Sequence, residues 1–317
     1  MIASRKNILI FSILPFTILF LIYELTFITS CCSSSFLMEY RLLRAVYSSV
    51  AGAVLAVTGC FLQSSFRNPL VDHHILGIGS GALFFTYTTV FFYGYNPFTV
   101  ALAAAMGGLI SLLLTVLIAE KISGSDVAYV LAGISVTTLF SGLSTFMLYY
   151  VQVKYPYASV LMVGSFILSR PQILPYLLVP VVFVSLGYPL LAKRLNVLLL
   201  GDENAQQLGV DPRLTRLASA LVAGLSSSII VCLFGLIGFI GLIAPHIARF
   251  LIKTSDNRLI MPLSASLGMI LLYSADLFSR TVMAPIWGEI PAGSIVSLFG
   301  APFFIIVLIT RFTGRKT

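Results

Sequence analysis

The chain has 317 residues, of which 58% are hydrophobic and only 9% are charged, and its net charge is +8 at neutral pH. A soluble domain carries about a quarter of its residues as charged side chains, so this chain has too few of them to cover a water-exposed surface. Its mean hydropathy of +1.02 agrees with that conclusion. The basic residues stand singly or in pairs at the edges of apolar runs and form no dense stripe, which argues against nucleic acid as a partner. The composition therefore predicts a protein that faces lipid over most of its area.

Apolar runs of roughly 20 residues, the length needed to cross a bilayer, recur along the whole chain. The first run, 7–28, follows two basic residues as a signal peptide would, but it is too long and no small-residue cleavage site follows, so we expect a retained span. Nine further spans are expected at 44–66, 75–94, 97–119, 127–150, 171–195, 213–233, 235–251, 259–284 and 295–311. The second of these nine and the seventh are rich in glycine and are expected to be irregular. The sequence predicts an all-α, polytopic membrane protein with about ten transmembrane helices in a single domain, 1–317.

The distribution of the basic residues predicts the orientation of the spans. If the N-terminus is cytoplasmic, fourteen Lys and Arg side chains lie at inner ends and five at outer ends, which is the asymmetry of the positive-inside rule. The inner set is Arg5, Lys6, Arg67, Lys121, Lys193, Arg194, Arg213, Arg216, Arg249, Lys253, Arg258, Arg311, Arg315 and Lys316. The outer set is Arg41, Arg44, Lys154, Arg170 and Arg280. An odd number of spans would place the two basic ends of the chain on opposite sides, so we expect ten spans and two cytoplasmic termini.

Glycines recur at short intervals in two of the apolar runs. The two sets are Gly235, Gly238 and Gly241, and Gly77, Gly79 and Gly81. Small residues let transmembrane backbones approach closely, so we expect both sets to lie at helix contacts. The GxGxG spacing also occurs in dinucleotide-binding loops, but no βαβ unit surrounds it here.

The longest polar segment in the interior of the chain, 201–213, lies on the predicted cytoplasmic side between the sixth and seventh spans. Its pattern is typical of a short helix, because Asp202 can cap the start and Gly209 can end the helix in the left-handed conformation. Asp211 is then expected to cap the next helix, with Pro212 at its first position. From these residues alone, the segment is either a solvated connector or a rigid lever on which a partner can push.

Several segments resemble motifs of the FecCD-type permeases, which import iron-siderophores, haem and vitamin B12. They are 59–63 with Gln63 (GxxxQ), 67–70 with Arg67, Asn68 and Pro69 (RNPL), 76–82 with Gly77 and Gly81 (LGxxxGA), 202–210 (DExAxxLGV), 239–249 with Gly241, Pro245, His246 and Arg249 (FIGLIxPHIxR), 289–293 with Glu289, Pro291 and Gly293 (ExPxG), and 300–304 with Gly300 and Pro302 (GxPxF). The matching segments occur in the order of the family. One departure is at 72–74, where Asp-His-His stands in place of the usual Asp-Pro, so the turn must be made differently.

The resemblance implies a BtuC-like permease fold and the role of membrane subunit in a binding-protein-dependent, ATP-driven importer. It also implies that 201–212 docks on a separate ATPase through Asp202, Glu203, Ala205, Gln206, Leu208 and Gly209. The chain has no GxxxxGK[ST] phosphate loop, so we expect it to bind no cofactor and to catalyse no reaction, with ATP and Mg²⁺ on the partner.

The implied partners are a second permease subunit (identical or related), two ATP-binding subunits, an extracytoplasmic substrate-binding protein and the lipid of the cytoplasmic (inner) membrane. We expect a ferric siderophore as the substrate, because that class dominates the family. Cobalamin, haem and molybdate are the alternatives within the same architecture.

Three arginines on the predicted outer side are candidates for docking the binding protein. Arg41 and Arg44 are three residues apart and share one helix face, and Arg280 lies at the outer end of the ninth span. The family's permeases present arginines here to acidic residues of the binding protein, whereas the residues alone are explained by contact with lipid headgroups. Asp276 lies four residues before Arg280. Because an acid near the bilayer centre costs roughly 2.5–3.5 kcal/mol, we expect an ion pair between the two near the surface.

Histidines and cysteines are not expected to form a metal site. His73 and His74 are adjacent and would point about 100° apart on a helix, and His246 is expected to make a structural hydrogen bond near a cytoplasmic helix end. The cysteines are Cys31, Cys32, Cys60 and Cys232. They show no CxxC spacing, and the last two lie in apolar runs as small packing residues. Lipidation or oxidation of the first two stays open.

Two other classes of function fit the sequence less well than an importer permease. A stand-alone secondary transporter carries buried charges for ion coupling, and here only Asp276 qualifies, without a convincing inverted repeat. An intramembrane enzyme needs a nucleophile with a base, or a metal set, at one depth, which the three histidines and scattered acids do not supply. Copurification of a nucleotide-binding subunit would separate the importer from both.

Overall fold

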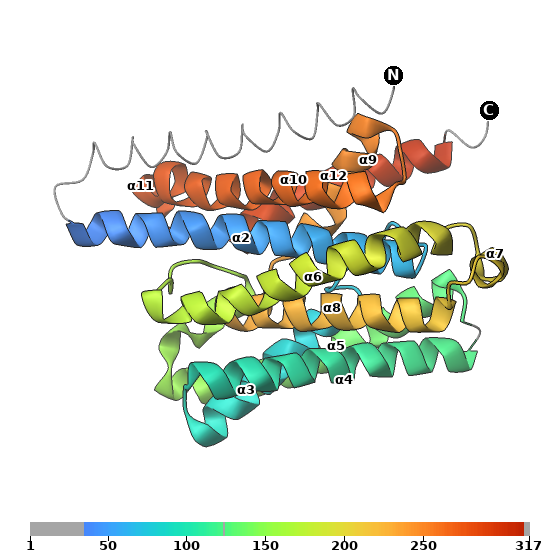
Figure 1. Ribbon diagram of the computed structural model, residues 1–317. Coiled ribbons are helices and arrows are strands. Elements are labelled where there is room, and N and C mark those ends of the chain that lie inside the picture. The colour runs from blue at the N-terminus through green and yellow to red at the C-terminus, as the bar shows by residue number, and fades with distance from the viewer. Residues whose placement is uncertain (1–34, 123, 314–317) are drawn as a thin grey trace.

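The computed structural model describes residues 35–122 and 124–313, and these residues form helices joined by short connections, with no strand among them. The predicted first span, 7–28, lies outside the described residues, as do Cys31 and Cys32. The main helices are α2 (Ser35–Ser65), α3 (Ile78–Tyr93), α4 (Pro97–Ile122), α5 (Asp126–Lys154), α6 (Leu174–Leu198), α7 (Asp202–Gln207), α8 (Pro212–Phe234), α9 (Ile240–Ile252), α10 (Asn257–Phe278), α11 (Ala284–Trp287) and α12 (Ala292–Thr313). Apart from the short α7 and α11, they lie side by side in one bundle (Figure 1).

Six of the described helices are long and apolar enough to cross a membrane, and three shorter apolar helices, α3, α9 and the first part of α12, lie among them. Each of the nine spans predicted from 44–66 onward coincides with one of these helices, which confirms the all-α, multi-pass architecture. The two glycine-rich spans are short helices preceded by turns, at 66–77 and 235–239, as the composition predicts.

Local sequence signals set several helix ends. The side chain of Ser125 accepts a hydrogen bond from the Ala128 N–H at the start of α5. At the start of α8, Asp211 accepts from two backbone N–H groups, and Pro212 occupies the first helical position as predicted. Gly94 and Gly235, both with positive φ, end α3 and α8. These caps place the connections at the two ends of the bundle.

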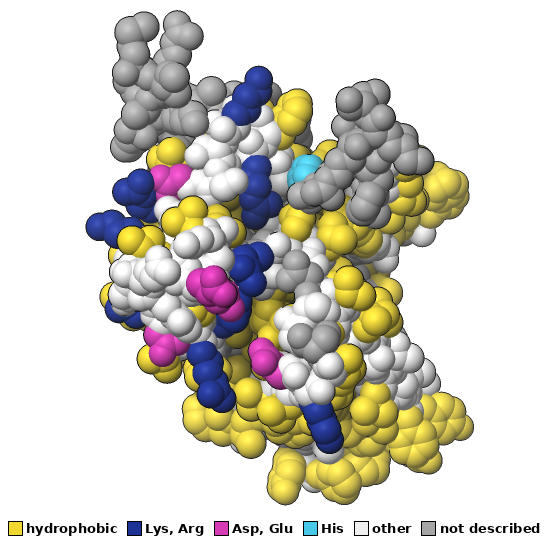
Figure 2. Space-filling view, turned by 90° about the vertical axis from the view of Figure 1, so that its right-hand side faces the viewer, with side chains coloured by type: hydrophobic (Ala, Val, Ile, Leu, Met, Phe, Trp, Pro, Cys, Tyr) yellow, Lys and Arg dark blue, Asp and Glu magenta, His cyan; other side chains and the backbone are white. Residues whose placement is uncertain are grey.

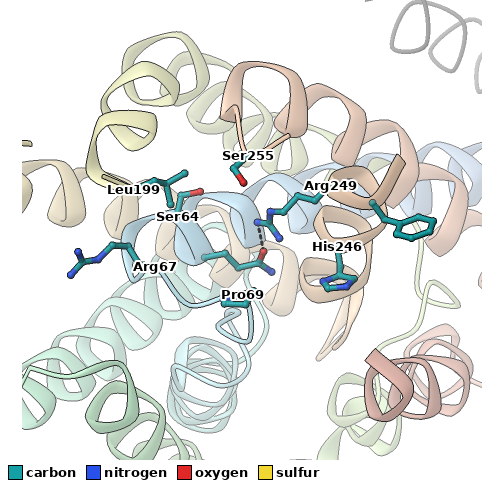
Figure 3. Close-up of a pocket in the computed structure, with 9 residues that line it drawn as sticks. Ser64, Arg67, Pro69, Leu199, His246, Arg249 and Ser255 are labelled. Carbon is teal, nitrogen blue, oxygen red and sulfur yellow. Dashed lines mark hydrogen bonds between the residues drawn. The ribbon is translucent and has the colours of Figure 1, made fainter. Parts of the chain in front are cut away.

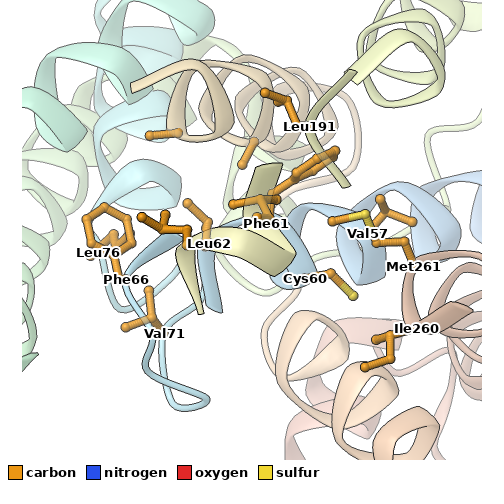
Figure 4. Close-up of a cluster of buried hydrophobic side chains, with 14 of the residues drawn as sticks. Val57, Cys60, Phe61, Leu62, Phe66, Val71, Leu76, Leu191, Ile260 and Met261 are labelled. Carbon is orange, nitrogen blue, oxygen red and sulfur yellow. The ribbon is translucent and has the colours of Figure 1, made fainter. Parts of the chain in front are cut away.

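Helix α2 is the central helix, and α6, α8, α9 and α10 pack around it. Its crossings with α9 and α10 bring backbone against backbone. A Cβ on Gly59 would lie 2.1 Å from the carbonyl oxygen of Gly241, and a Cβ on Gly52 would lie 2.1 Å from that of Gly268. Beside these crossings, side chains such as Phe61, Leu62, Leu191 and Met261 form a buried core (Figure 4). Helices α4, α5 and α6 leave many large apolar side chains exposed, which is typical of a surface that faces lipid.

The glycine repeats only partly serve helix contacts. Gly241 packs against α2, and a Cβ on Gly81 would lie 2.5 Å from the Gly107 carbonyl oxygen of α4, so these two meet the expectation. Gly235 and Gly77 have φ of 87° and 79° at a helix end and a helix start, and both also lie at close contacts, since an added Cβ would be 2.5 Å from the Leu161 carbonyl oxygen and 3.0 Å from Val136 of α5. A Cβ on Gly79 would lie 2.6 Å from the Leu236 side chain. Gly238 lies in the connection before α9 with no neighbour within 4 Å of an added Cβ, so the prediction of a helix contact was wrong for this residue.

Candidate functional site

The short helix α7 projects from one end of the bundle, which we call the α7 end (Figure 1). It follows Gly201 (φ 105°) and ends at Gly209 (φ 76°), where the Val210 N–H donates to the Ala205 carbonyl at 2.9 Å. This is the left-handed stop predicted from the sequence. Ala205 is buried against the bundle, whereas Glu203, Gln206 and Leu208 are exposed. The helix therefore presents a mixed polar and apolar face away from the rest of the chain.

Asp202 anchors α7 and does not cap it. The helix begins after Gly201 without a side-chain cap, so the predicted capping role was wrong. Both carboxylate oxygens of Asp202 accept from Arg216 Nη2, at 2.7 and 2.8 Å, and Arg67 Nη2 lies 3.5 Å from the same carboxylate. Arg216 also donates through Nε to the Ser65 carbonyl at 3.1 Å. These bonds join α7 to α8 and to the C-terminal end of α2.

A cavity of about 400 Å³ opens beside this anchor, and its wall brings together motif residues from separate parts of the chain (Figure 3). Gln63 donates through Nε2 to the Gly241 carbonyl at 2.9 Å and accepts from Arg249 Nη2 at 2.6 Å. Pro69 and His246 line the same cavity, and Arg67 points away from Arg249. The hydrogen bonds of Gln63 thus tie the end of α2 to α9 at the cavity wall.

The turn between α2 and α3 is built without the proline that the family usually carries. Arg67 has φ of 50°, and the Asn68 side chain accepts from the Leu70 N–H at 2.9 Å. Asp72 then accepts from the N–H groups of residues 74 and 75, at 3.0 and 2.8 Å. A carboxylate that binds two successive N–H groups fixes a turn as a proline would. The two histidines that follow Asp72 lie in this turn and not on a helix, and the described residues include no group of three or more His, Cys, Asp or Glu placed to hold a metal.

A second polar cluster joins α6 to α10 at the same end. Asn196 donates to Asp256 at 2.6 Å and accepts from the Asn257 N–H at 2.7 Å. Asp256 caps α10 and pairs with Arg258 at 2.7 Å, and the Arg258 guanidinium lowers the pKa of Asp256 to about 2. Sequence reasoning missed this cluster, although an Asp directly before an apolar run is an N-cap signal.

The opposite end of the bundle holds a cluster of ion pairs that includes two of the predicted docking arginines. We call it the outer end, after the orientation predicted from the basic residues. Arg44 is 2% exposed, and its guanidinium lies 2.9 Å from Asp276 and 2.7 Å from Glu289. Arg280, with a side chain 9% exposed, lies 3.3 Å from Asp276. The predicted pair between Asp276 and Arg280 is present at this end of the bundle, but Asp276 also pairs with Arg44, which the sequence did not predict.

This cluster leaves the three predicted docking residues in different positions. Arg41 is half-buried, one turn before Arg44 on α2, and its side chain reaches the surface. The guanidinium of Arg44 is buried and occupied by two carboxylates, so the structure corrects the expectation that it faces a partner. Glu289, predicted only as a motif residue, is the partly exposed member of the cluster, at 32%.

The remaining motif residues build the contact between α12 and the connections before it. The Gly293 N–H donates to the Gly164 carbonyl at 2.9 Å, and a Cβ on Gly293 would lie 2.3 Å from the Val163 oxygen. Gly300 packs in the same way against Phe239. Pro245 and Pro302 lie inside α9 and α12, and the Pro291 carbonyl accepts from the Ser294 N–H at 3.0 Å. An apolar cavity of about 890 Å³ lies between α12 and the turns at 72–75 and 236–239.

Charged side chains of both signs gather on the α7 end, with apolar side chains around them (Figure 2). Helices able to cross a membrane, with apolar flanks, define a multi-pass membrane protein that holds a polar helix out at one end. The chain belongs to the FecCD transport family, whose model matches residues 8–310. The resemblance predicted from the motifs is thereby confirmed.

The chain is similar to membrane permease subunits of ABC transporters. It is 34% identical over 291 residues to an ABC transporter permease protein of Methanocaldococcus jannaschii, covering 86% of this chain and 81% of the relative. It is 35% identical over 277 residues to the cobalamin import system permease protein BtuC of Halobacterium salinarum, covering 86% and 72%. It is 30% identical over 274 residues to the heme-iron transport system permease protein IsdF of Staphylococcus aureus, covering 86% and 81%.

Two solved structures share the fold. A metal-chelate type ABC transporter in an inward-facing conformation matches with a TM-score of 0.79 and 28% identity, covering 95% of this chain and 99% of that chain. PsaBC from Streptococcus pneumoniae, in complex with Fab, matches with a TM-score of 0.63 and 18% identity, covering 90% and 94%. The second likeness shows the fold alone.

Proposed function

We propose that this chain is the permease subunit of an ATP-driven importer that carries a ferric siderophore across the cytoplasmic membrane. The observation that carries the proposal is the position of helix α7. One face of α7 is exposed, and Asp202 ties the helix through Arg216 to α8 and α2. Similarity to permeases named for cobalamin and heme-iron, and to a metal-chelate type transporter, supports a metal chelate as the cargo.

In this proposal, α7 sits in a cleft of a separate ATPase subunit. Glu203, Gln206 and Leu208 supply the exposed contacts, Ala205 and Asp202 hold the helix to the bundle, and Gly209 fixes its end. When the ATPases bind ATP and Mg²⁺ and close, movement of α7 passes through Arg216 to α8 and α2. Two permease subunits, identical or related, and two ATPases form the transporter, with both termini of this chain in the cytoplasm.

Docking of the binding protein is proposed for the outer end. Arg41 offers its positive charge to an acidic side chain of the binding protein, while Arg44 and Arg280 organise the surface beneath it through Asp276 and Glu289. Complementary charges of this kind set the specificity and rate of association.

Two measurements test the function separately from the substrate. Affinity purification of this chain should recover an ATPase subunit, and its absence would favour a stand-alone transporter. Uptake of ferric siderophore, haem, cobalamin and molybdate is then compared in a strain that lacks the gene and in the complemented strain. Rescue by ferric siderophore alone supports the proposed cargo, whereas rescue by one of the other three assigns that cargo and leaves the importer mechanism intact.

A further inference from the structure

An apolar cavity of about 600 Å³ lies at the outer end, between the starts of α4 and α6 and over the C-terminal end of α8. Val90 of α3, Val151 of α5 and Leu233 of α8 form part of its wall. The short helix η1 (Pro156–Met162) closes one side and is tied to α3, because Tyr87 donates to the Ala158 carbonyl at 2.9 Å. This cavity is separate from the site at the α7 end.

Two basic side chains converge on this cavity from different segments. Lys154 is the last residue of α5, and Arg170 directly precedes the short helix η2 (Pro171–Ile173). Both are exposed, and no described carboxylate lies within 4.0 Å of either, in contrast to the buried pairs of Arg44 at the same end. The described residues that line the cavity include no Asp or Glu, so its side chains carry a charge of +2. These two charges favour an anionic ligand.

The helices beside the cavity carry exposed apolar side chains near its mouth. Phe98 and Leu102 are exposed on the first turns of α4, and Leu174 and Leu178 are exposed on the first turns of α6. These two helices flank α8 on the same side of the bundle (Figure 1). A water-filled vestibule would carry polar side chains at these positions, whereas acyl chains pack well against them. These positions favour a ligand that comes from the membrane.

The cavity is basic near its mouth and apolar in its interior, which matches the charged headgroup and the acyl chains of a phospholipid. Lys154 and Arg170 stand at the ends of spans, which is the level of the phosphate headgroups. Thr86, which lines the cavity, lies seven residues before Tyr93, the last residue of α3, or about 10 Å along the helix. Thr86 is buried, and its hydroxyl has no hydrogen-bond partner among the described residues.

We propose that this cavity binds one acidic phospholipid of the outer leaflet, with its phosphate between Lys154 and Arg170 and an acyl chain in the apolar interior. The lipid would lie against η1, whose Leu161 carbonyl accepts from the Leu236 N–H at 2.9 Å. Leu236 belongs to the connection that borders the 890 Å³ cavity beside α12. A bound lipid thus stabilises the wall of that cavity, whichever cargo the protein carries.

The test measures lipid binding to the intact, delipidated transporter complex by native mass spectrometry. Phosphatidylglycerol is compared with phosphatidylcholine of the same acyl chains. The variant Lys154→Gln with Arg170→Gln should bind phosphatidylglycerol roughly 25-fold more weakly, about fivefold for each basic side chain lost near an anionic headgroup. Lys193→Gln with Arg194→Gln removes the same charge from exposed positions on α6 near the α7 end and should leave this affinity unchanged.

A cavity-filling variant tests the acyl chain separately from the charges. Leu233→Trp keeps both cations and fills the interior, so it should also lose the bound phosphatidylglycerol. Equal affinity for the two lipids in the wild type, or equal weakening in the control pair, overturns the proposal. Retention of phosphatidylglycerol by Leu233→Trp overturns the placement of the chain, and tighter binding of inorganic phosphate or of an anionic chelate overturns the choice of a lipid.

Discussion

Replacing Gly209 by valine tests the coupling role of α7 through the backbone alone. Gly209 has φ of 76°, and an added Cβ would meet no atom within 4 Å, so the substitution introduces no clash. Its cost is that of a β-branched residue in the left-handed region, about 2 kcal/mol. That cost lowers the population of the closed turn at the end of α7 by a factor of about 30. The turn includes the Val210 to Ala205 hydrogen bond, so α7 should fray at this end while the spans stay folded.

The assay compares affinity for the ATPase subunit and ATP-dependent uptake in reconstituted vesicles. Gly209→Val should weaken both, and Gly209→Asn, which tolerates the left-handed region, should restore most of the loss. Gly288→Val is a matched control, because Gly288 has φ of 83°, is equally unobstructed and lies at the outer end. It should leave affinity for the ATPase unchanged. Wild-type coupling in Gly209→Val, or an equal loss of ATPase affinity in Gly288→Val, would refute the assignment of α7.

Three further predictions concern charged residues. Asp276→Ala should lower the free energy of unfolding by about 3–5 kcal/mol, because the buried Arg44 guanidinium then loses its buried carboxylate partner. Glu289→Gln should lower it less, since Glu289 is partly exposed. Thermal unfolding in detergent measures both. Asp256 has its pKa lowered from 3.8 to about 2 on folding, so it should contribute stability above pH 4 that is lost as the pH falls toward 2. Unfolding midpoints from pH 6 to 2.5 should therefore fall more steeply in the wild type than in Asp256→Asn. Arg41→Glu should weaken binding of the substrate-binding protein and leave the unfolding midpoint unchanged, and unaltered binding would return Arg41 to contact with lipid headgroups.

The spans and the local caps could be predicted because their signals are contained in neighbouring residues. The length of the apolar runs predicted the spans. Asp211 with Pro212 predicted the start of α8, and Gly209 predicted the end of α7. Each depends on the conformation of a few consecutive residues, which tertiary packing did not override here.

The ion clusters could not be predicted in the same way. Arg44 and Asp276 are 232 residues apart in sequence, and no local pattern tells which distant acid will meet a given arginine. The role of Asp202 was missed for a related reason, since an acidic residue at a helix start suits a cap, and only the packing of α8 brings Arg216 within reach. In an apolar bundle, a buried charge requires a partner, so the search for one should have extended to every span.

The backbone contacts of α2 have a consequence for how the gene can vary. Every amino-acid replacement of Gly52, Gly59 or Gly268 adds a Cβ, and each such atom would lie 2.1 to 2.3 Å from a carbonyl oxygen of the helix it crosses. At these three codons, only synonymous changes preserve the present spacing of the helices. Gly241 is less restricted, because an added Cβ would lie 3.1 Å from its nearest neighbour, the Leu55 carbonyl oxygen. Alanine at this position therefore requires a shift of only a few tenths of an ångström. A saturation library selected for transport should therefore lose nearly all missense variants at the first three positions, while alanine persists at the fourth.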